Sequence, residues 1–279
     1  MKPLITLTMF AVVSQTALAA APFNAVISPL TPAQGDVVVV SLPAQPVATG
    51  ATFLGTAGAV FPYKGGQRAV FGVGPNQKAG AYPLKITFAD GSTFEQTVSV
   101  RSRRFAVLNL PVPEKLQQTP EQLVTNLGVV NTAVRETVAN KTGVVLLKEP
   151  FGLPLYDNRK VSSPFGEVRK TGDEQIRHLG VDFGGKVGSY VAAINAGTVT
   201  KAYVDPVYGN SVIVDHGQGM YSLYMHLDTI ATKAGAVLKK GAKVGTLGET
   251  GYASGPHLHL SVKINGVSVD PLRLVSLFK

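Results

Sequence analysis

All five histidines of the chain lie beyond residue 177, at positions 178, 216, 226, 257 and 259. Imidazole nitrogens bind metal ions and transfer protons near neutral pH. The chain has no cysteine, so any zinc site must use histidine and carboxylate ligands. Catalytic zinc usually keeps three protein ligands and leaves one position for water. The clustered histidines therefore point to metal-assisted hydrolysis.

The first candidate pair is His178 and Asp182, in the segment HLGVD. Residues four apart in an extended strand share a face, but they lie roughly 13 Å apart. Gly180 stands between them and permits a bend or bulge. We therefore expect the chain to bend at Gly180 if both side chains bind one metal ion.

The second candidate pair is His257 and His259, which flank Leu258. Residues two apart in a strand point to one face, so both imidazoles would project together while Leu258 faces the core. The alternation continues to residue 264, where Asn265-Gly266 predicts a hairpin turn. Two histidines on a solvated strand face are the alternative.

The other two histidines carry weaker signals. His226 ends a strand predicted to begin at Tyr221, and a single histidine there is commonly a core residue bonded to the backbone. His216 stands at a strand end before a glycine turn, and we expect it to be structural.

Three metal ligands can be assembled from these residues. They are His178, Asp182 and one of His257 and His259, and the residues alone do not choose between the last two. The remaining histidines could deprotonate the attacking water and stabilise the charge that develops at a scissile carbonyl. Spare histidines next to a three-ligand site favour a catalytic over a structural zinc.

Three motifs occur in the order found in lysostaphin-type (LytM-like) zinc endopeptidases. They are His178-x-x-x-Asp182, Met225-His226-Leu227 and Gly255-Pro256-His257-Leu258-His259. The chain resembles this family over about residues 150 to 273.

This resemblance implies a role for each candidate residue. It implies that His178, Asp182 and His259 bind Zn²⁺, and that His226 and His257 act on the water and the tetrahedral intermediate. It also implies a compact, antiparallel β domain with a groove across its sheet. The substrates of the family are crossbridges or stem peptides of peptidoglycan.

The elements that must position these residues are mostly β. Residues 151–279 form the predicted peptidase domain, and residues 20–104 read as short strands of an immunoglobulin-like β-sandwich. The run Val37–Val40 and the hairpin signal Asp90-Gly91 belong to this sandwich. It contains no histidine, so we expect a supporting or wall-binding role for it.

Residues 105–150 are expected to form a linker with a helix. Thr119 followed by Pro120 predicts a helix start. Apolar residues at spacings of three and four, from Leu123 to Val138, share one face. This face is expected to pack on one of the domains; the alternative is that the helix shields the active-site groove.

The N-terminus predicts export. Lys2, an apolar run and small residues ending at Ala19 match a signal peptide over residues 1–19. We therefore expect a secreted or periplasmic protein of the cell envelope, with no transmembrane segment after signal removal. The formal net charge of +9 favours an anionic partner.

The expected function is zinc-dependent hydrolysis of peptide bonds in bacterial peptidoglycan by a monomeric enzyme. Nucleic acid is not expected as a partner, because the chain has no recognisable nucleic-acid motif. The alternative is a non-catalytic or latent scaffold that binds peptidoglycan or activates another hydrolase. Which peptide bond is cut does not follow from the sequence.

Overall fold

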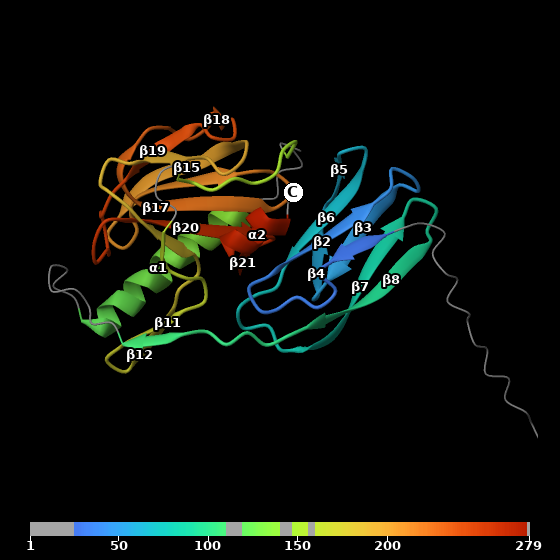
Figure 1. The fold of residues 1–279 in the computed structure, drawn as a ribbon, viewed down its shortest axis with the longest axis horizontal. Coiled ribbons are helices and arrows are strands. Elements are labelled where there is room, and N and C mark those ends of the chain that lie inside the picture. The colour runs from blue at the N-terminus through green and yellow to red at the C-terminus, as the bar shows by residue number, and fades with distance from the viewer. Residues whose placement is uncertain (1–24, 110–118, 140–146, 156–159, 278–279) are drawn as a thin grey trace, which may run out of the picture.

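The computed structural model describes residues 25–109, 119–139, 147–155 and 160–277. The predicted signal peptide, residues 1–19, lies outside them. Figure 1 shows two β-rich bodies side by side, one from the first eight strands and one from the C-terminal strands. The mostly β fold class predicted from the sequence is confirmed.

The N-terminal body consists of two four-stranded antiparallel sheets, with strand orders β1-β2-β6-β5 and β4-β3-β7-β8. The strands are β1 (Val26–Ser28), β2 (Val37–Leu42), β3 (Ala48–Phe53), β4 (Thr56–Gly58), β5 (Val60–Tyr63), β6 (Gly66–Gly72), β7 (Gly80–Phe88) and β8 (Thr93–Val100). Both sheets contribute apolar side chains to one core, among them Val38, Phe71 and Ile86. The two sheets therefore form a β-sandwich.

Strand β2 is buried on both faces, which explains its unbroken run of valines. Val38 and Val40 point into the sandwich core. Val37 and Val39 point the other way, into a core shared with the C-terminal body. A strand covered on both sides reads as a continuous apolar run, whereas a half-exposed strand alternates.

The C-terminal body is built on one ten-stranded antiparallel sheet. Its main path is β10-β13-β20-β17-β16-β15-β18; β14 pairs with β19, β19 with β17, and β21 with β20. The strands are β10 (Val161–Ser163), β13 (Val181–Gly184), β14 (Tyr190–Ala192), β15 (Gly197–Asp205), β16 (Gly209–Asp215), β17 (Met220–Ile230), β18 (Val237–Leu238), β19 (Lys243–Leu247), β20 (His257–Ile264) and β21 (Val267–Val269). Helix α2 (Pro271–Leu277) follows and packs against β2.

The two faces of this sheet differ in chemistry because side chains alternate along each strand. On β20, Leu258 and Leu260 point into the main core. His257 and His259 point to the opposite face, as the sequence predicts. The predicted turn is also present, with φ of 50° at Asn265 and 80° at Gly266 between β20 and β21.

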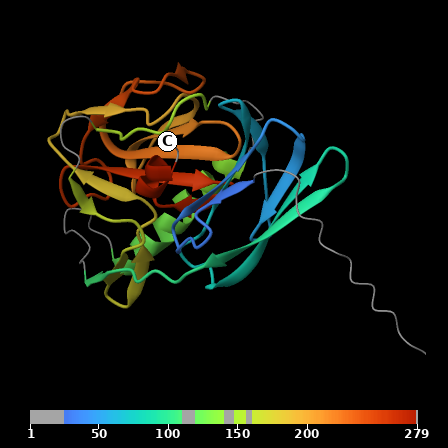
Figure 2. The same ribbon diagram turned by 45° about the vertical axis from the view of Figure 1, so that its right-hand side comes forward.

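Helix α1 (Pro120–Ala139) lies across the histidine-bearing face of the sheet (Figures 1 and 2). Its start is capped as predicted, because the amide of Gln122 donates to Thr119 Oγ1 at 3.3 Å. Val134 and Val138 pack on apolar residues of β16 and β17. No helix among the described residues is long and apolar enough to cross a bilayer.

A small three-stranded sheet stands beside α1. It consists of β9 (Val107–Asn109), β11 (Val168–Thr171) and β12 (Glu174–Arg177). Strand β9 runs parallel to β11, so the segment that leaves the sandwich is tied to the C-terminal body. Strand β12 contacts α1 and leads directly into the first histidine.

Candidate metal centre and cleft

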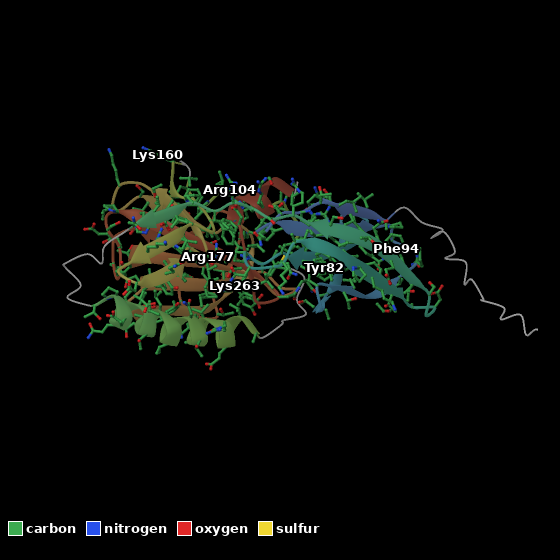
Figure 3. All side chains as sticks on the ribbon, turned by 90° about the horizontal axis from the view of Figure 1, so that it is seen from below. Tyr82, Phe94, Arg104, Lys160, Arg177 and Lys263 are labelled. Carbon is green, nitrogen blue, oxygen red and sulfur yellow. The ribbon has the colours of Figure 1, made fainter. Side chains whose placement is uncertain are left out.

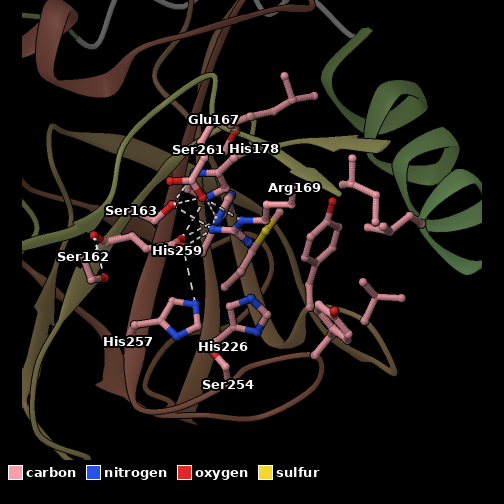
Figure 4. Close-up of a pocket in the computed structure, with 18 of the residues that line it drawn as sticks. Ser162, Ser163, Glu167, Arg169, His178, His226, Ser254, His257, His259 and Ser261 are labelled. Carbon is pink, nitrogen blue, oxygen red and sulfur yellow. Dashed lines mark hydrogen bonds and ion pairs between the residues drawn. The ribbon is translucent and has the colours of Figure 1, made fainter. Parts of the chain in front are cut away.

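Three buried side chains bring their ligand atoms together. His178 Nε2 lies 2.9 Å from both Asp182 Oδ1 and His259 Nδ1. His259 Nδ1 lies 2.8 Å from Asp182 Oδ1, which closes the triangle (Figure 4). Asp182 on β13 and His259 on β20 are paired directly across the antiparallel ladder. This group could hold a metal ion.

The chain bends between His178 and Asp182, as Gly180 predicts. His178 follows the end of β12, and β13 starts only at Val181. The bend brings side chains four residues apart within bonding range of one point. A Cβ atom at Gly180 would lie 2.5 Å from His259 Nε2 and 2.6 Å from the carbonyl oxygen of Leu260. Only glycine allows this close approach.

The contacts of His178 show which of its ring nitrogens faces the triangle. His178 Nδ1 lies 2.9 Å from the carbonyl oxygen of Pro164, which can only accept. His178 Nδ1 therefore carries a proton, and Nε2 is the ring nitrogen directed at Asp182. Burial lowers the pKa of His259 to about 4, so this imidazole is neutral at pH 7. Three ligand atoms that converge in this way fit a cation. A backbone carbonyl is a common partner for the second nitrogen of a metal-binding histidine.

Arg169 holds the other oxygen of Asp182. Its Nη2 lies 2.7 Å from Asp182 Oδ2 and 2.9 Å from Ser163 Oγ. Its Nε lies 3.2 Å from Glu167 Oε1. Burial alone would raise the pKa of the Asp182 carboxyl, but the adjacent His178 and His259 bring it well below its usual value. The carboxylate is therefore charged and oriented, with Oδ1 facing the histidines.

His226 and His257 stand beside the triangle with their ring centroids 4.8 Å apart. His226 Nδ1 lies 2.8 Å from the carbonyl oxygen of Thr250, and His257 Nδ1 lies 2.8 Å from that of Gly255. Both Nδ1 atoms therefore carry protons, so each ring can exchange a proton only at Nε2. Burial, and next the neighbouring His257 and His259, lower the pKa of His226 to about 3. At neutral pH the His226 ring is therefore uncharged.

A bulge in β17 turns His226 into the cleft. The strand was expected to end near Leu227, but it runs on to Ile230 and pairs with β19. Its register against β16 shifts between Tyr224 and Leu227, and His226 has φ of 62°. Simple alternation would place His226 opposite Met225, whereas both residues line the same cavity. Bulges of this kind redirect side chains beside functional sites.

His216 is structural, as expected. Its Nδ1 lies 2.7 Å from the carbonyl oxygen of Ala196, and its Nε2 lies 2.8 Å from Ser222 Oγ. Burial lowers its pKa to about 4, so the ring is neutral at pH 7. It does not line the cavity that contains the other four histidines.

His178, His226, His257 and His259 line a cavity of about 670 Å³. One wall is helix α1, which contributes Leu127, Asn131 and Val134. Tyr208 Oη donates to Asn131 Oδ1 at 2.9 Å, and the Tyr208 ring stacks on His259 with a centroid distance of 6.3 Å. The helix thus packs on the C-terminal body, as expected, and forms one wall of the cavity; whether it shields the groove stays a prediction.

Several lining residues had no signal in the sequence. Arg169 and Glu167 come from the charged β11–β12 region, which reads as an ordinary solvated hairpin. Lys263 belongs to the alternation on β20, but an isolated lysine in a strand is usually exposed. Here it is only 9% exposed.

The C-terminal body matches known proteins in sequence. Residues 176–271 match the model of Peptidase family M23. An uncharacterized metalloprotease of Haemophilus influenzae is 42% identical over 138 residues, which cover 48% of this chain and 29% of the relative. Peptidoglycan DD-endopeptidase ShyC of Vibrio cholerae is 36% identical over 129 residues, which cover 45% of this chain and 29% of the relative. The match thus spans less than a third of either relative.

A solved structure matches most of the chain. The putative peptidase M23 from Pseudomonas aeruginosa has a TM-score of 0.68 and 28% sequence identity. The match covers 88% of this chain and 96% of that chain. The similarity therefore extends beyond the C-terminal sheet to the sandwich.

Proposed function

We propose that this protein, whose residues 176–271 match the model of Peptidase family M23, is a zinc-dependent endopeptidase that hydrolyses peptide bonds in bacterial peptidoglycan. The observation that carries this proposal is the convergence of His178, Asp182 and His259 on one point, with two further histidines at hand. We propose these three as the zinc ligands, and His226 and His257 as the catalytic pair. The predicted signal peptide favours action in the periplasm or outside the cell.

Each residue has a defined task in this proposal. A bound zinc ion would supply a nucleophilic water and polarise the scissile carbonyl. His226 and His257 each hold Nδ1–H on a backbone carbonyl, so each can accept a proton only on Nε2. The imidazolium that forms can then donate to the developing oxyanion or to the leaving amine.

Arg169 supports this arrangement from outside the ligand set. By binding Asp182 Oδ2 it leaves Oδ1 directed at the histidines. This orientation favours attachment of the metal through one carboxylate oxygen. Partners behind the ligands commonly fix ligand geometry in this way.

The proposed roles predict different metal contents for three variants. His259→Ala should lose both zinc and activity, because one of three ligands is removed. His257→Ala and His226→Ala should keep zinc and lose at least about a hundredfold in kcat, as expected for a proton-transfer group. Zinc analysis of the purified variants checks this, and full zinc occupancy in His259→Ala would contradict the ligand assignment.

Activity itself is tested on the polymer. The purified protein is incubated with peptidoglycan sacculi, with and without a zinc chelator, and released fragments are identified by mass spectrometry. Release of peptides cut at one defined bond, abolished by the chelator, is the expected result. If zinc-loaded protein releases nothing from several wall types, the protein is a latent enzyme or a scaffold. Helix α1, which lines the cavity, would then account for latency.

A further inference from the structure

The charges that line the cavity are not balanced. Apart from histidines and tyrosines, the charged residues in the lining are Glu167, Asp182, Arg169, Arg177 and Lys263. Arg169 pairs with both acids. Within the described residues, no carboxylate lies within 4.0 Å of the side-chain nitrogens of Arg177 or Lys263. Among the described residues, Lys263 and Arg177 therefore line the cavity without a counter-charge, although Arg177 Nη1 donates to the carbonyl oxygen of Gly166 at 3.0 Å and its guanidinium lies over the Phe105 ring.

Lys263 is the more unusual of the two. It is only 9% exposed, and its Nζ donates one hydrogen bond, to Ser268 Oγ at 2.8 Å. An ammonium group has three donors, and a buried charge is normally paired. The nearby charged group on α1 is Arg135, which has the same sign.

The acid on the same sheet face does not neutralise Lys263. Asp215 stands opposite Tyr221, which in turn stands opposite Lys263 in the ladder. Asp215 accepts from the amide of Gly217 at 2.7 Å and is bonded to Tyr221. Asp215 is thus two strands away, about 10 Å by strand spacing. Its side chain is already hydrogen-bonded to Gly217 and Tyr221.

Lys263 is aligned with the proposed metal centre. His257, His259, Ser261 and Lys263 alternate along β20 and all four line the cavity. Figure 4 shows the first three, and Figure 3 labels Lys263 and Arg177. Four residues of strand separate Lys263 from His259, which corresponds to about 13 Å. An extended peptide that lies along β20 covers this distance with about four residues.

We propose that Lys263, with Arg177 in the same lining, forms a subsite that binds a free carboxylate of the peptide substrate, about four residues from the scissile bond. This inference rests on the proposed endopeptidase function and narrows its substrate class. Such a subsite selects peptides that carry a free carboxylate, as stem peptides do, over uncharged glycine bridges. Burial lowers the pKa of Lys263 to about 8, so the group is still mostly charged at neutral pH.

The test uses two synthetic crosslinked stem-peptide fragments that differ at one group. One carries the free carboxylate, and in the other it is a carboxamide. Binding to the metal-free full chain is measured by calorimetry, and kcat/KM is measured with the zinc-loaded protein. We expect the wild type to prefer the carboxylate peptide at least tenfold in both measurements, as a desolvated charge pair would give.

The variant Lys263→Met removes the charge at similar length. It should bring both ratios close to one, because kcat/KM and affinity for the carboxylate peptide fall towards the values for the carboxamide peptide. Lys263→Arg should keep most of the preference, because it keeps the charge. Lys85→Met, at an exposed position on β7, is the matched control and should behave like wild type.

The outcomes separate the subsite from the enzyme. Equal binding of both peptides by the wild type, or an unchanged preference in Lys263→Met, overturns the subsite. Cleavage of sacculi with no preference between the peptides leaves the endopeptidase function standing alone. Preferential binding that depends on Lys263, without cleavage of any peptide, supports the subsite and removes the proposed function. A Lys263→Met protein that fails to fold is replaced by Lys263→Gln in the same measurements.

Discussion

A buried lysine without a carboxylate partner destabilises the folded protein at neutral pH. Its pKa falls from 10.5 to about 8, first because of burial and second because of Arg135. The folded state therefore binds this proton more weakly than the unfolded state does. The resulting loss of folding stability is complete below pH 8, becomes smaller as the pH rises towards 10.5, and is absent above it.

Lys263→Met should therefore raise the free energy of unfolding at pH 7 by about 1–3 kcal/mol. This increase in the free energy of unfolding is smaller than the value that corresponds to the whole pKa shift, because methionine cannot make the hydrogen bond to Ser268. Urea unfolding of wild type and variant at pH 7 and pH 10.5 measures it, and the gain should shrink at the higher pH. A variant less stable than wild type at pH 7 would mean that Lys263 serves mainly to hold the β20–β21 hairpin.

The sequence predicted some of these side-chain positions better than others. The pair His257 and His259 followed from strand alternation alone, and the bend between His178 and Asp182 followed from Gly180. The orientation of His226 did not, because it depends on a bulge whose register is set by neighbouring strands. No local pattern marks such a bulge.

Pairing between distant segments limited what could be predicted for the elements. The end of β17 was missed because its last residues pair with β19, which joins the sheet from further along the chain. Helix α1, by contrast, was predicted from its cap at Thr119 and its apolar spacing, which are local signals. Which surface it covers depends on the sheet beneath it.

The position of α1 over the cleft predicts that loosening the helix will increase access of the polymer. Val138 is buried against β16 and β17 and does not line the cavity. Val138→Asp would bury an unpaired carboxylate at a cost of several kcal/mol, so the helix should detach rather than accept it. Turnover of peptidoglycan sacculi should then rise severalfold, while turnover of a small peptide changes less.

The control for this experiment is Val129→Asp on the same helix, where the side chain is 68% exposed and the change should have no effect. Hydrogen exchange of the α1 amides verifies detachment independently of activity. If exchange shows a detached helix and turnover of sacculi falls, α1 is part of the substrate-binding wall and not a barrier to the polymer.

At the scale of the whole molecule, the sandwich and the C-terminal body share one apolar core. Val37, Phe61 and Val70 from the sandwich belong to the same cluster as Leu260 and Leu274. Ion pairs cross the same boundary, with 3.0 Å between Arg103 and Asp270 and 3.3 Å between Arg273 and Asp36. A shared core of this kind couples the unfolding of its two halves. We therefore expect the wild type to unfold in a single calorimetric transition.

Gly72 allows a close approach between the two bodies, and it provides the test of this coupling. A Cβ at Gly72 would lie 2.7 Å from Val269 Cγ1 and 3.2 Å from Val267 Cβ. Gly72→Leu should therefore force β6 away from β21 at a cost of about 1–3 kcal/mol. Two separate transitions should then appear.

Gly50→Leu is the matched control, because nothing lies within 4 Å of its Cβ position. A single transition retained in Gly72→Leu would show that β9, β11 and the ion pairs suffice to couple the two bodies. In that case the packing of β6 on β21 would not be what makes the molecule unfold as one unit.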